Sequence, residues 1–232
     1  MFEPTLRAVD TDLWVAEQPQ KFLGLQLGTR MTVVRLGEEL VVLSAISPTP
    51  SLVEQVEALG TVRWVVAPNC FHHLYAGAFT AQFDQASLLG PPGIVKKRSD
   101  LAFDGQLPVD APAEWEGQLE FVRVEGMPKL DEALFFHPST RTLITCDLAF
   151  CFDESAPFLT RCVFRVVGGY GKLGPSVLEK VLTRDRGLAR ASLRRALEWD
   201  FERVIVAHGR IVESGGRADL ESGYDWLLTG GD

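Results

Sequence analysis

The stretch VAPNCFHHLYAG at residues 66–77 leaves an apolar run, breaks at a Pro-Asn pair and then places two histidines side by side. The chain has 4 histidines in 232 residues, so half of them lie here. Imidazole is the commonest protein ligand of transition metals, and a histidine pair after a strand therefore indicates a metal site. The alternative is that His72 and His73 are ordinary loop or helix-cap residues, because adjacent side chains diverge and both need not reach one ion.

The composition favours a soluble globular protein that acts on a small molecule or binds a protein partner. Hydrophobic residues make up 46% and charged residues 23%, which suffices for a real core. The net charge is −8, and the one local basic cluster, residues 96–98, is too short to follow a phosphate backbone. We therefore expect no nucleic-acid partner, and an oligomer is compatible with the composition.

The termini and the cysteines give a cytoplasmic expectation. Residues 1–10 lack a basic region followed by an apolar core, which a signal peptide requires. No apolar run approaches the roughly 18–20 residues of a membrane span, so we expect no membrane association. The 4 cysteines show no CxxC spacing, as expected of reduced thiols in the cytosol.

The first half of the chain reads as short strands with helices between them. Residues 36–39 (LGEE) predict a hairpin turn between two β-branched runs. Residues 47–60 predict a helix with Ser51 as N-cap and Gly60 as C-cap. A strand follows at residues 62–68, ended by Pro68, and a second helix is predicted at residues 72–83.

The second half repeats this order. Strands are predicted at residues 119–126, within residues 132–150, at residues 160–168 and at residues 203–212. Helical stretches are predicted at residues 175–201 and 216–228. Each half of the chain thus begins with strands and continues with strand–helix units. This repeated order predicts two β-sheets faced by helices in one domain spanning residues 1–232.

Two further metal-capable side chains end predicted strands. Asp147 ends the strand RTLITC, and His208 ends the strand RVIVA and precedes a glycine. Ends of neighbouring strands are where sites are assembled in layered α/β folds, and imidazole with carboxylate is a usual donor set for zinc or iron. The alternatives are a turn or helix-cap carboxylate for Asp147 and a buried, hydrogen-bonded turn histidine for His208.

Four segments in order resemble the metallo-β-lactamase superfamily, and more closely a degenerate lactamase-like branch of it. The family signature is a strand followed by Thr-His-x-His-x-Asp-His, a later His in a Gly-His-Thr-Pro-Gly turn, a Gly-Asp after a strand, and a final strand followed by Gly-His-Gly. The corresponding segments here are VVAPNCFHHLYAG (65–77), VEGMPKLDEALFF (124–136), TLITCDLAF (142–150) and VIVAHGRIV (204–212). The resemblance spans nearly the whole chain and implies a four-layer αββα sandwich.

The resemblance also implies which ligands are kept. Pro68 and Cys70 stand at the first two histidines of the signature and Met127 stands near the third, so the first metal site is lost. The second site is retained: His72 stands at the signature Asp, and the last three ligands match at His73, Asp147 and His208. This pattern implies a variant with one metal ion.

We therefore expect a metal-dependent hydrolase with one zinc or iron ion. The ion would lower the pKa of a bound water, which attacks an ester, thioester, amide or phosphoester. His72, His73, Asp147 and His208 are the expected ligands, and Asp147 and His73 are the candidates for a catalytic role. The competing hypotheses are a non-catalytic scaffold that binds a small molecule or protein, and a redox or oxygen-using iron protein.

Other chemically capable residues are assigned structural roles. His137 is predicted to be a surface residue of a hairpin turn. Cys70 is a further ligand or a small apolar filler beside the site, and Cys146 is predicted to be buried. The glycine-rich residues 166–174 lack the Lys-Ser/Thr of a phosphate loop and are predicted to form a flexible loop bordering the pocket.

Overall fold

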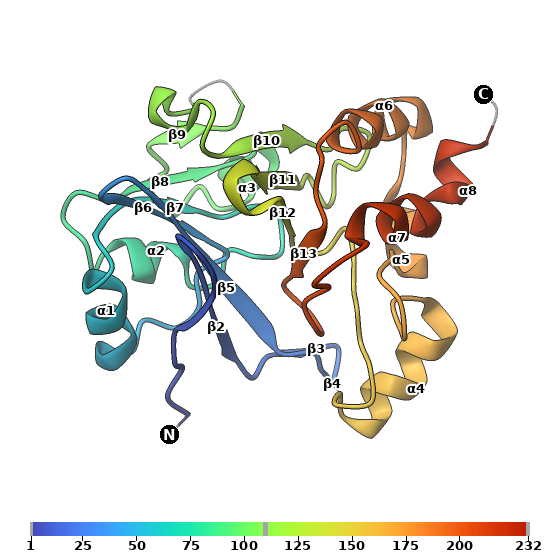
Figure 1. The fold of residues 1–232 in the computed structure, drawn as a ribbon, viewed down its shortest axis with the longest axis horizontal. Coiled ribbons are helices and arrows are strands. Elements are labelled where there is room, and N and C mark those ends of the chain that lie inside the picture. The colour runs from blue at the N-terminus through green and yellow to red at the C-terminus, as the bar shows by residue number, and fades with distance from the viewer. Residues whose placement is uncertain (1, 109–110, 231–232) are drawn as a thin grey trace.

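Two β-sheets pack face to face between two groups of helices, in the αββα arrangement predicted from the sequence (Figure 1). The computed structural model describes residues 2–108 and 111–230. The amino-terminal half of the chain, blue to green in Figure 1, forms one sheet and its helices. The carboxy-terminal half, green to red, forms the other.

The first sheet has seven strands, and its direction changes halfway across. Its first four strands pair antiparallel, with the predicted turn at residues 37–38 between the third and fourth, and the remaining strands pair parallel. In spatial order the strands are β1 (Arg7–Asp10), β2 (Leu13–Gln18), β5 (Thr29–Leu36), β6 (Glu39–Leu43), β7 (Thr61–Val66), β8 (Ser87–Gly90) and β9 (Gly105–Gln106).

The second sheet has four strands: β10 (Glu120–Arg123), β11 (Ala133–His137), β12 (Thr142–Thr145) and β13 (Arg203–Val206). The first three pair antiparallel, and β12 and β13 pair parallel. A separate hairpin of β3 (Lys21–Phe22) and β4 (Leu25–Gln26) projects between β2 and β5 along the chain. Because β12 and β13 are parallel, their carboxyl ends lie at the same edge of the second sheet.

Apolar side chains alternate along the strands and feed a core on each side of the sheets. Along β5, Val34 and Leu36 face the second sheet, whereas Met31 and Val33 face the outer helices. The outer face of the first sheet is covered by α1 (Pro50–Glu57), α2 (Ala76–Thr80) and α3 (Pro92–Lys97).

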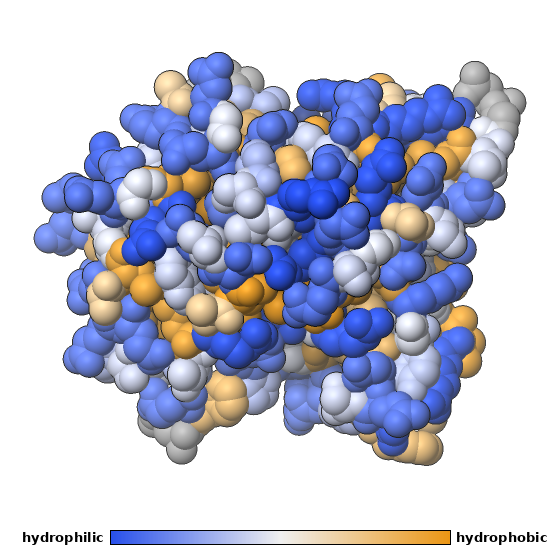
Figure 2. Space-filling view, viewed as in Figure 1, coloured by the Kyte–Doolittle hydropathy of each residue, from blue (hydrophilic) through white to orange (hydrophobic). Residues whose placement is uncertain are grey.

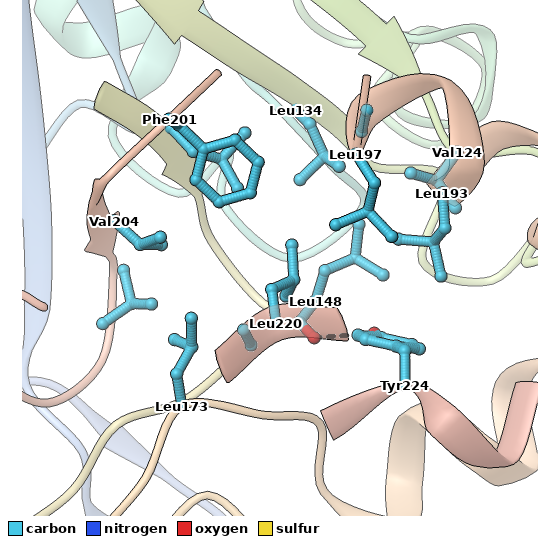
Figure 3. Close-up of a cluster of buried hydrophobic side chains, with 14 of the residues drawn as sticks. Val124, Leu134, Leu148, Leu173, Leu193, Leu197, Phe201, Val204, Leu220 and Tyr224 are labelled. Carbon is cyan, nitrogen blue, oxygen red and sulfur yellow. Dashed lines mark hydrogen bonds between the residues drawn. The ribbon is translucent and has the colours of Figure 1, made fainter. Parts of the chain in front are cut away.

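The outer face of the second sheet is covered by α6 (Arg186–Ala196), α7 (Gly216–Gly223) and α8 (Asp225–Leu228). Figure 3 shows this cluster, in which Leu134 of β11 faces Leu197 and Leu193 of the α6 region. The buried Tyr224 hydroxyl donates to the Leu148 carbonyl oxygen at 2.7 Å, so the one polar atom of this side chain is satisfied. Short 3-10 turns occur at Ala113–Trp115 and Pro138–Thr140.

The boundaries of the first two helices differ from prediction. The N-cap of α1 is Thr49, whose Oγ1 accepts from the Leu52 amide at 3.3 Å, and the predicted cap Ser51 lies inside the first turn. Pro50 causes this shift, because proline suits the first helical position and leaves the preceding hydroxyl as the cap. The C-cap is Ala58, two residues before the predicted Gly60. Helix α2 covers only residues 76–80 of the predicted 72–83. The strand predicted at residues 160–168 is wrong: helix α4 (Phe158–Val167) occupies this segment, and its buried residues Thr160 and Phe164 are four positions apart, as on one face of a helix.

The prediction for His137 is wrong, and that for Cys146 is confirmed. His137 is buried at the end of β11 and is not a surface residue. The following 3-10 turn folds over its ring, so that Nδ1 is 2.9 Å from Thr140 Oγ1 and Nε2 is 3.2 Å from Ser139 Oγ. Cys146 is buried. Among the described residues, no helix combines the length and apolar composition that crossing a membrane requires.

Candidate metal centre

Three predicted ligands converge where strands β7, β12 and β13 end. The ligand atoms of His72, Asp147 and His208 all lie within 4.8 Å of one another. The two Nε2 atoms are 3.1 Å apart, His72 Nε2 is 3.4 Å from Asp147 Oδ2, and His208 Nε2 is 3.3 Å from Asp147 Oδ1. Residues 61 to 136 positions apart thus direct their donor atoms to one point.

These separations fit ligands arranged around a small cation. A tetrahedral ion with ligand atoms at about 2.0–2.1 Å separates those atoms by about 3.3 Å. The observed distances of 3.1–3.4 Å therefore correspond to edges of such a polyhedron. Two imidazoles and one carboxylate are also a donor set that zinc and iron accept.

The second nitrogen of each imidazole is held by the protein. His208 Nδ1 donates to the Gly28 carbonyl oxygen at 2.6 Å, and His72 Nδ1 is hydrogen-bonded to Ser44 Oγ at 2.7 Å. Since a carbonyl can only accept, neutral His208 carries its proton on Nδ1 and presents the Nε2 lone pair to His72. Two ring nitrogens at 3.1 Å then require a cation or a proton between them. This outer hydrogen bonding is typical of metal-bound histidines.

Asn69 links the histidine turn to the carboxylates. Its Oδ1 accepts from the amides of Phe71 and His72, both at 2.8 Å, which forms the turn that orients His72. Its Nδ2 donates to Glu132 Oε2 at 2.7 Å and to Asp147 Oδ2 at 2.8 Å. This fully buried amide is therefore completely hydrogen-bonded.

Glu132 fixes the loop that carries Asp147. Its fully buried carboxylate accepts at Oε1 from Thr145 Oγ1 (2.6 Å) and the Cys146 amide (2.7 Å). Its Oε2 accepts from the Asp147 amide (2.8 Å) and the Leu148 amide (3.2 Å), besides Asn69. Five donors on one carboxylate hold the backbone after β12 in a single conformation.

The charges of the group stabilise one another. Burial raises the pKa of Asp147, but attraction to His72 and the hydrogen bonds that the protonated imidazoles of His208 and His72 donate outweigh it and hold this pKa below its ordinary range. Burial lowers the pKa of His72, but Asp147 and then Glu132 outweigh it and raise this pKa. Burial and the Asp147 charge raise the pKa of Glu132 against its hydrogen-bond donors. The site thus favours positive charge at the point shared by the donor atoms.

Arg30 ties the backbone around His208 to the first sheet. This buried guanidinium donates through Nη1 to the Val206 carbonyl oxygen, and through Nη2 to the Gly209 carbonyl oxygen at 2.6 Å. Its Nε donates to Glu17 Oε1 at 2.9 Å, which balances the buried charge. The end of β13 is therefore fixed to β5 on both sides of His208.

The structure does not bring His73 into the group. Arg98 Nη1 donates to His73 Nδ1 at 2.8 Å, so this ring is directed to α3, away from the shared point. Burial, followed by the charges of Lys97 and Arg98, lowers the pKa of His73 to about 4. The side chains of adjacent residues in the Asn69 turn diverge, which explains the separation. His73 still lines the cavity that opens on the group.

Cys70 and Met127, which stand at or near histidines of the resembled signature, offer no comparable donor set. Cys70 packs in the core beneath the outer helices, and burial, with the charge of Asp131, raises the pKa of its thiol. Met127 packs in the core of the second sheet. A protonated thiol and a buried thioether bind zinc poorly, because the thiolate is the ligand.

A cavity of about 660 Å³ opens on the three converging side chains. Its walls come from the β3–β4 hairpin, from α4 (Phe158–Val167) and from α5 (Val177–Leu182). Most of its lining residues are apolar. Hydrophobic side chains also reach the surface over α4, at the lower right of Figure 2.

Sequence reasoning missed the residues that orient the ligands: Gly28, Arg30, Ser44, Asn69 and Glu132. Apart from the turn that Asn69 forms, their contacts span 13 to 180 positions, which local patterns do not contain. The one local signal was the Pro-Asn pair after β7. Asparagine there is typical of a turn that hydrogen-bonds the following amides, as Asn69 does.

The fold is that of the metallo-β-lactamases, as solved structures show. A metallo-β-lactamase from Pontibacter korlensis superposes with a TM-score of 0.66 at 15% identity, covering 99% of this chain and 100% of that one. The mono-zinc form of the metallo-β-lactamase FIM-1 from Pseudomonas aeruginosa gives 0.63 at 11% identity, with coverages of 98% and 94%. The metal-soaked flavodiiron core of Flv1 from Synechocystis gives 0.65 at 13% identity, with coverages of 98% and 61%.

The chain has a metallo-β-lactamase-like fold with a candidate metal-binding group of three residues. Within this class the chain belongs to the family described as Domain of unknown function (DUF4336), whose model matches residues 10–167. The comparison with curated proteins gives no match.

Proposed function

We propose that this protein is a metal-dependent hydrolase with one ion held by His72, Asp147 and His208. The observation that carries the proposal is the convergence of two Nε2 atoms and a carboxylate at 3.1–3.4 Å while both Nδ1 atoms are hydrogen-bonded. The bound ion would supply Lewis acidity and a water of lowered pKa. Three protein ligands leave coordination positions for water and substrate.

The chain's own residues orient these ligands. Asn69 and Glu132 hold Asp147, Ser44 holds His72, and the Gly28 carbonyl fixes the protonated nitrogen of His208. Such outer partners raise ligand basicity and restrict ring rotation. The apolar walls of the cavity limit water around the reacting bond, which strengthens electrostatic interactions there.

His73 is proposed as a hydrogen-bond donor and not as a ligand. Its pKa of about 4 keeps the ring neutral at neutral pH. Because arginine can only donate, His73 Nδ1 accepts from Arg98, and the ring proton is on Nε2. A neutral imidazole with its proton on Nε2 can donate to a substrate oxygen in the cavity that it lines. The sequence-based ligand set is thereby reduced to three.

The proposal of one ion rests on the residues at the first site. Pro68 has no donor side chain, and Cys70 and Met127 pack in apolar cores. The bond that is hydrolysed belongs to an ester, thioester, amide or phosphoester. A second candidate, a redox iron protein, is favoured by the donor set itself, because two histidines and one carboxylate also form the facial triad of mononuclear iron enzymes.

Metal binding is the first test. Equilibrium dialysis against zinc, and separately against iron(II) without oxygen, should load about one equivalent, as in a mononuclear site. The variant Asp147→Asn should lose binding, whereas the control His73→Gln should keep it. The variant His72→Gln repeats the test if Asp147→Asn does not fold. No bound metal in the folded wild type, or two ions about 3.5–4 Å apart by anomalous scattering, would overturn the proposal.

The loaded metal then separates the two chemical classes. Zinc-loaded protein should hydrolyse p-nitrophenyl acetate faster than the Asp147→Asn variant does. Activity confined to iron-loaded protein with oxygen and a reductant, together with no hydrolysis of ester, thioester, amide or phosphoester probes, would favour the iron candidate.

A further inference from the structure

We propose that the substrate carries an extended aliphatic acyl group, which lies in the apolar cavity with its carbonyl carbon at the metal centre. This inference rests on the proposed hydrolase and names its substrate class. In the reaction, the oxygen of water bonds to the acyl carbon, the bond to the leaving oxygen, sulfur or nitrogen breaks, and the leaving atom takes a proton. The products are a fatty carboxylate and an alcohol, thiol or amine.

Helix α5 packs Leu182 against the core of the second sheet but directs its other apolar side chains, Val177, Leu178 and Val181, to the cavity. Its buried residue is Glu179, which accepts from the amide and hydroxyl of Ser176 in a capping box. Val177, Leu178 and Val181 are 49%, 45% and 74% exposed, although all three line the cavity. Core packing does not explain this arrangement, whereas an apolar ligand against α5 does.

The opposite wall is the β3–β4 hairpin, which also presents apolar side chains. Leu23 at its tip has φ of 48° and is 87% exposed, although branched residues rarely occupy this backbone region. Phe22 is partly exposed and lies edge-on to Phe71, with ring centroids 6.2 Å apart. Leucine at a strained, exposed turn indicates a function for its side chain beyond stabilising the hairpin.

The floor between these walls is continuous with the metal centre. Phe150 stacks on His208 with ring centroids 5.8 Å apart, and Phe164 of α4 packs against Phe150. Val163 and Val167 of α4 extend the same lining outward. An occupant that follows these side chains reaches the two Nε2 atoms, which favours a small molecule with one reactive end over a protein segment lying across the rim.

The charges of the cavity suit an acyl compound and its carboxylate product. The lining includes Lys21 and Lys97, and its carboxyl groups, Asp147 and Glu179, are both hydrogen-bonded within the protein. Lys97 Nζ lies 5.4 Å from the Phe71 ring centroid and donates to the Cys70 carbonyl oxygen at 2.6 Å. This cation is next to the turn that carries His72, where the oxygens of a carbonyl or carboxylate would lie.

The test measures binding of acetate, hexanoate and decanoate to the zinc-loaded protein by isothermal titration calorimetry. Each methylene buried in the cavity should tighten binding by about fourfold. Leu178→Asp should weaken decanoate binding at least tenfold and leave acetate unchanged. The matched control is Leu188→Asp on α6, because Leu188 is 47% exposed, close to Leu178, and does not line the cavity. Decanoate binding to that control should equal that of the wild type.

Equal affinity for the three carboxylates, or equal weakening in both leucine variants, would overturn the inference. Binding to phosphatidylcholine vesicles without chain-length-dependent binding of the monomeric carboxylates would also overturn it, since the apolar rim would then face a lipid surface. Metal binding without decanoate binding refutes this inference alone. Decanoate binding by a protein that binds no metal refutes the hydrolase and the reaction, and leaves only the ligand class of the cavity.

Discussion

His137 and His208 are both buried at strand ends of the second sheet, yet their surroundings differ in one respect. Both ring nitrogens of His137 lie next to the hydroxyls of Ser139 and Thr140, which are two and three residues away. His208 has one nitrogen on the distant Gly28 carbonyl, while the other faces His72 and Asp147. The first histidine is satisfied by its own turn. The second directs its Nε2 to two other side chains that can bind a metal.

The strand directions explain this difference. Strand β11 is antiparallel to β12, so that His137 pairs with Thr142 at the amino end of β12. Strand β13 is parallel to β12, so that the residues following both strands reach the same edge. Burial and residue type are therefore shared by the two histidines, whereas the sheet edge decides which of them can join a metal site.

The largest expected effect is a difference between His137 and His208 variants in how far a chelator lowers their stability. With metal present at 100 to 1,000 times its dissociation constant, binding stabilises the wild type by about 3–4 kcal/mol. A chelator should remove this stability from the wild type and from His137→Ala, and should not affect His208→Ala. Thermal unfolding of the three proteins with and without chelator measures it. A wild type that is insensitive to the chelator would contradict the difference between the two rings.

The next effect concerns Glu132, which orients the loop of Asp147 in the candidate metal site. The partners of His137 are hydroxyls of its own turn and include no such carboxylate. In Glu132→Gln the new amide group must face amide donors such as those of Cys146 and Asp147, which costs about 1–3 kcal/mol of unfolding free energy. Displacement of Asp147 should weaken metal binding by about 10- to 100-fold. The measurements are urea unfolding and zinc competition, with the exposed Glu125→Gln as control. Unchanged zinc affinity would mean that Glu132 supports the loop alone.

A smaller effect is expected at Ser44. Its hydroxyl is the partner of His72 Nδ1, so Ser44→Ala should free the ring to rotate and weaken zinc binding by about 10-fold. Competition with a chromophoric chelator measures the change. The control is Ser47→Ala, because the hydroxyl of Ser47 has no contact with the imidazoles. Equal affinities of the two variants would show that the packing around His72 suffices to orient it.

The smallest effect is a pH dependence at His137. Burial lowers the pKa of His137 below its unfolded value of about 6.5, so the unfolded state binds more protons as the pH falls through 6.5. The stability contributed by this histidine is therefore present above that pH and lost below it. The difference in unfolding free energy between the wild type and His137→Gln should shrink from pH 7 to pH 5. A difference that grows with acidity would contradict the sign.

The sequence predicted the sheets well because alternation and β-branched runs are local signals. Val65, Ile144 and Val206 lie in core strands as predicted, and the ligand residues follow the ends of those strands. The αββα order came from the resemblance of four ordered segments. Predicted helix boundaries were less accurate, because the hydroxyl before Pro50 and the hydroxyl after it are equally plausible caps in the sequence.

The hydrogen bonds that orient the ligand side chains could not be predicted from the sequence. His72 and His73 are equivalent in the sequence, and the hydrogen bonds of Asn69 and Arg98 decide which ring faces Asp147. Glu132 lies before an apolar strand and has no local feature of a buried carboxylate.

The hydrogen bond from His208 to Gly28 joins residues 180 positions apart, which has a consequence for biosynthesis. While the ribosome is still making the last strand, the chain already contains His72 and Asp147 but cannot complete the donor set. Long-range contacts of this kind also form late in folding, because loop closure must come first. Metal acquisition would therefore require that both halves of the fold have joined, and the metal-loaded fraction of a preparation would report how many molecules have completed both halves.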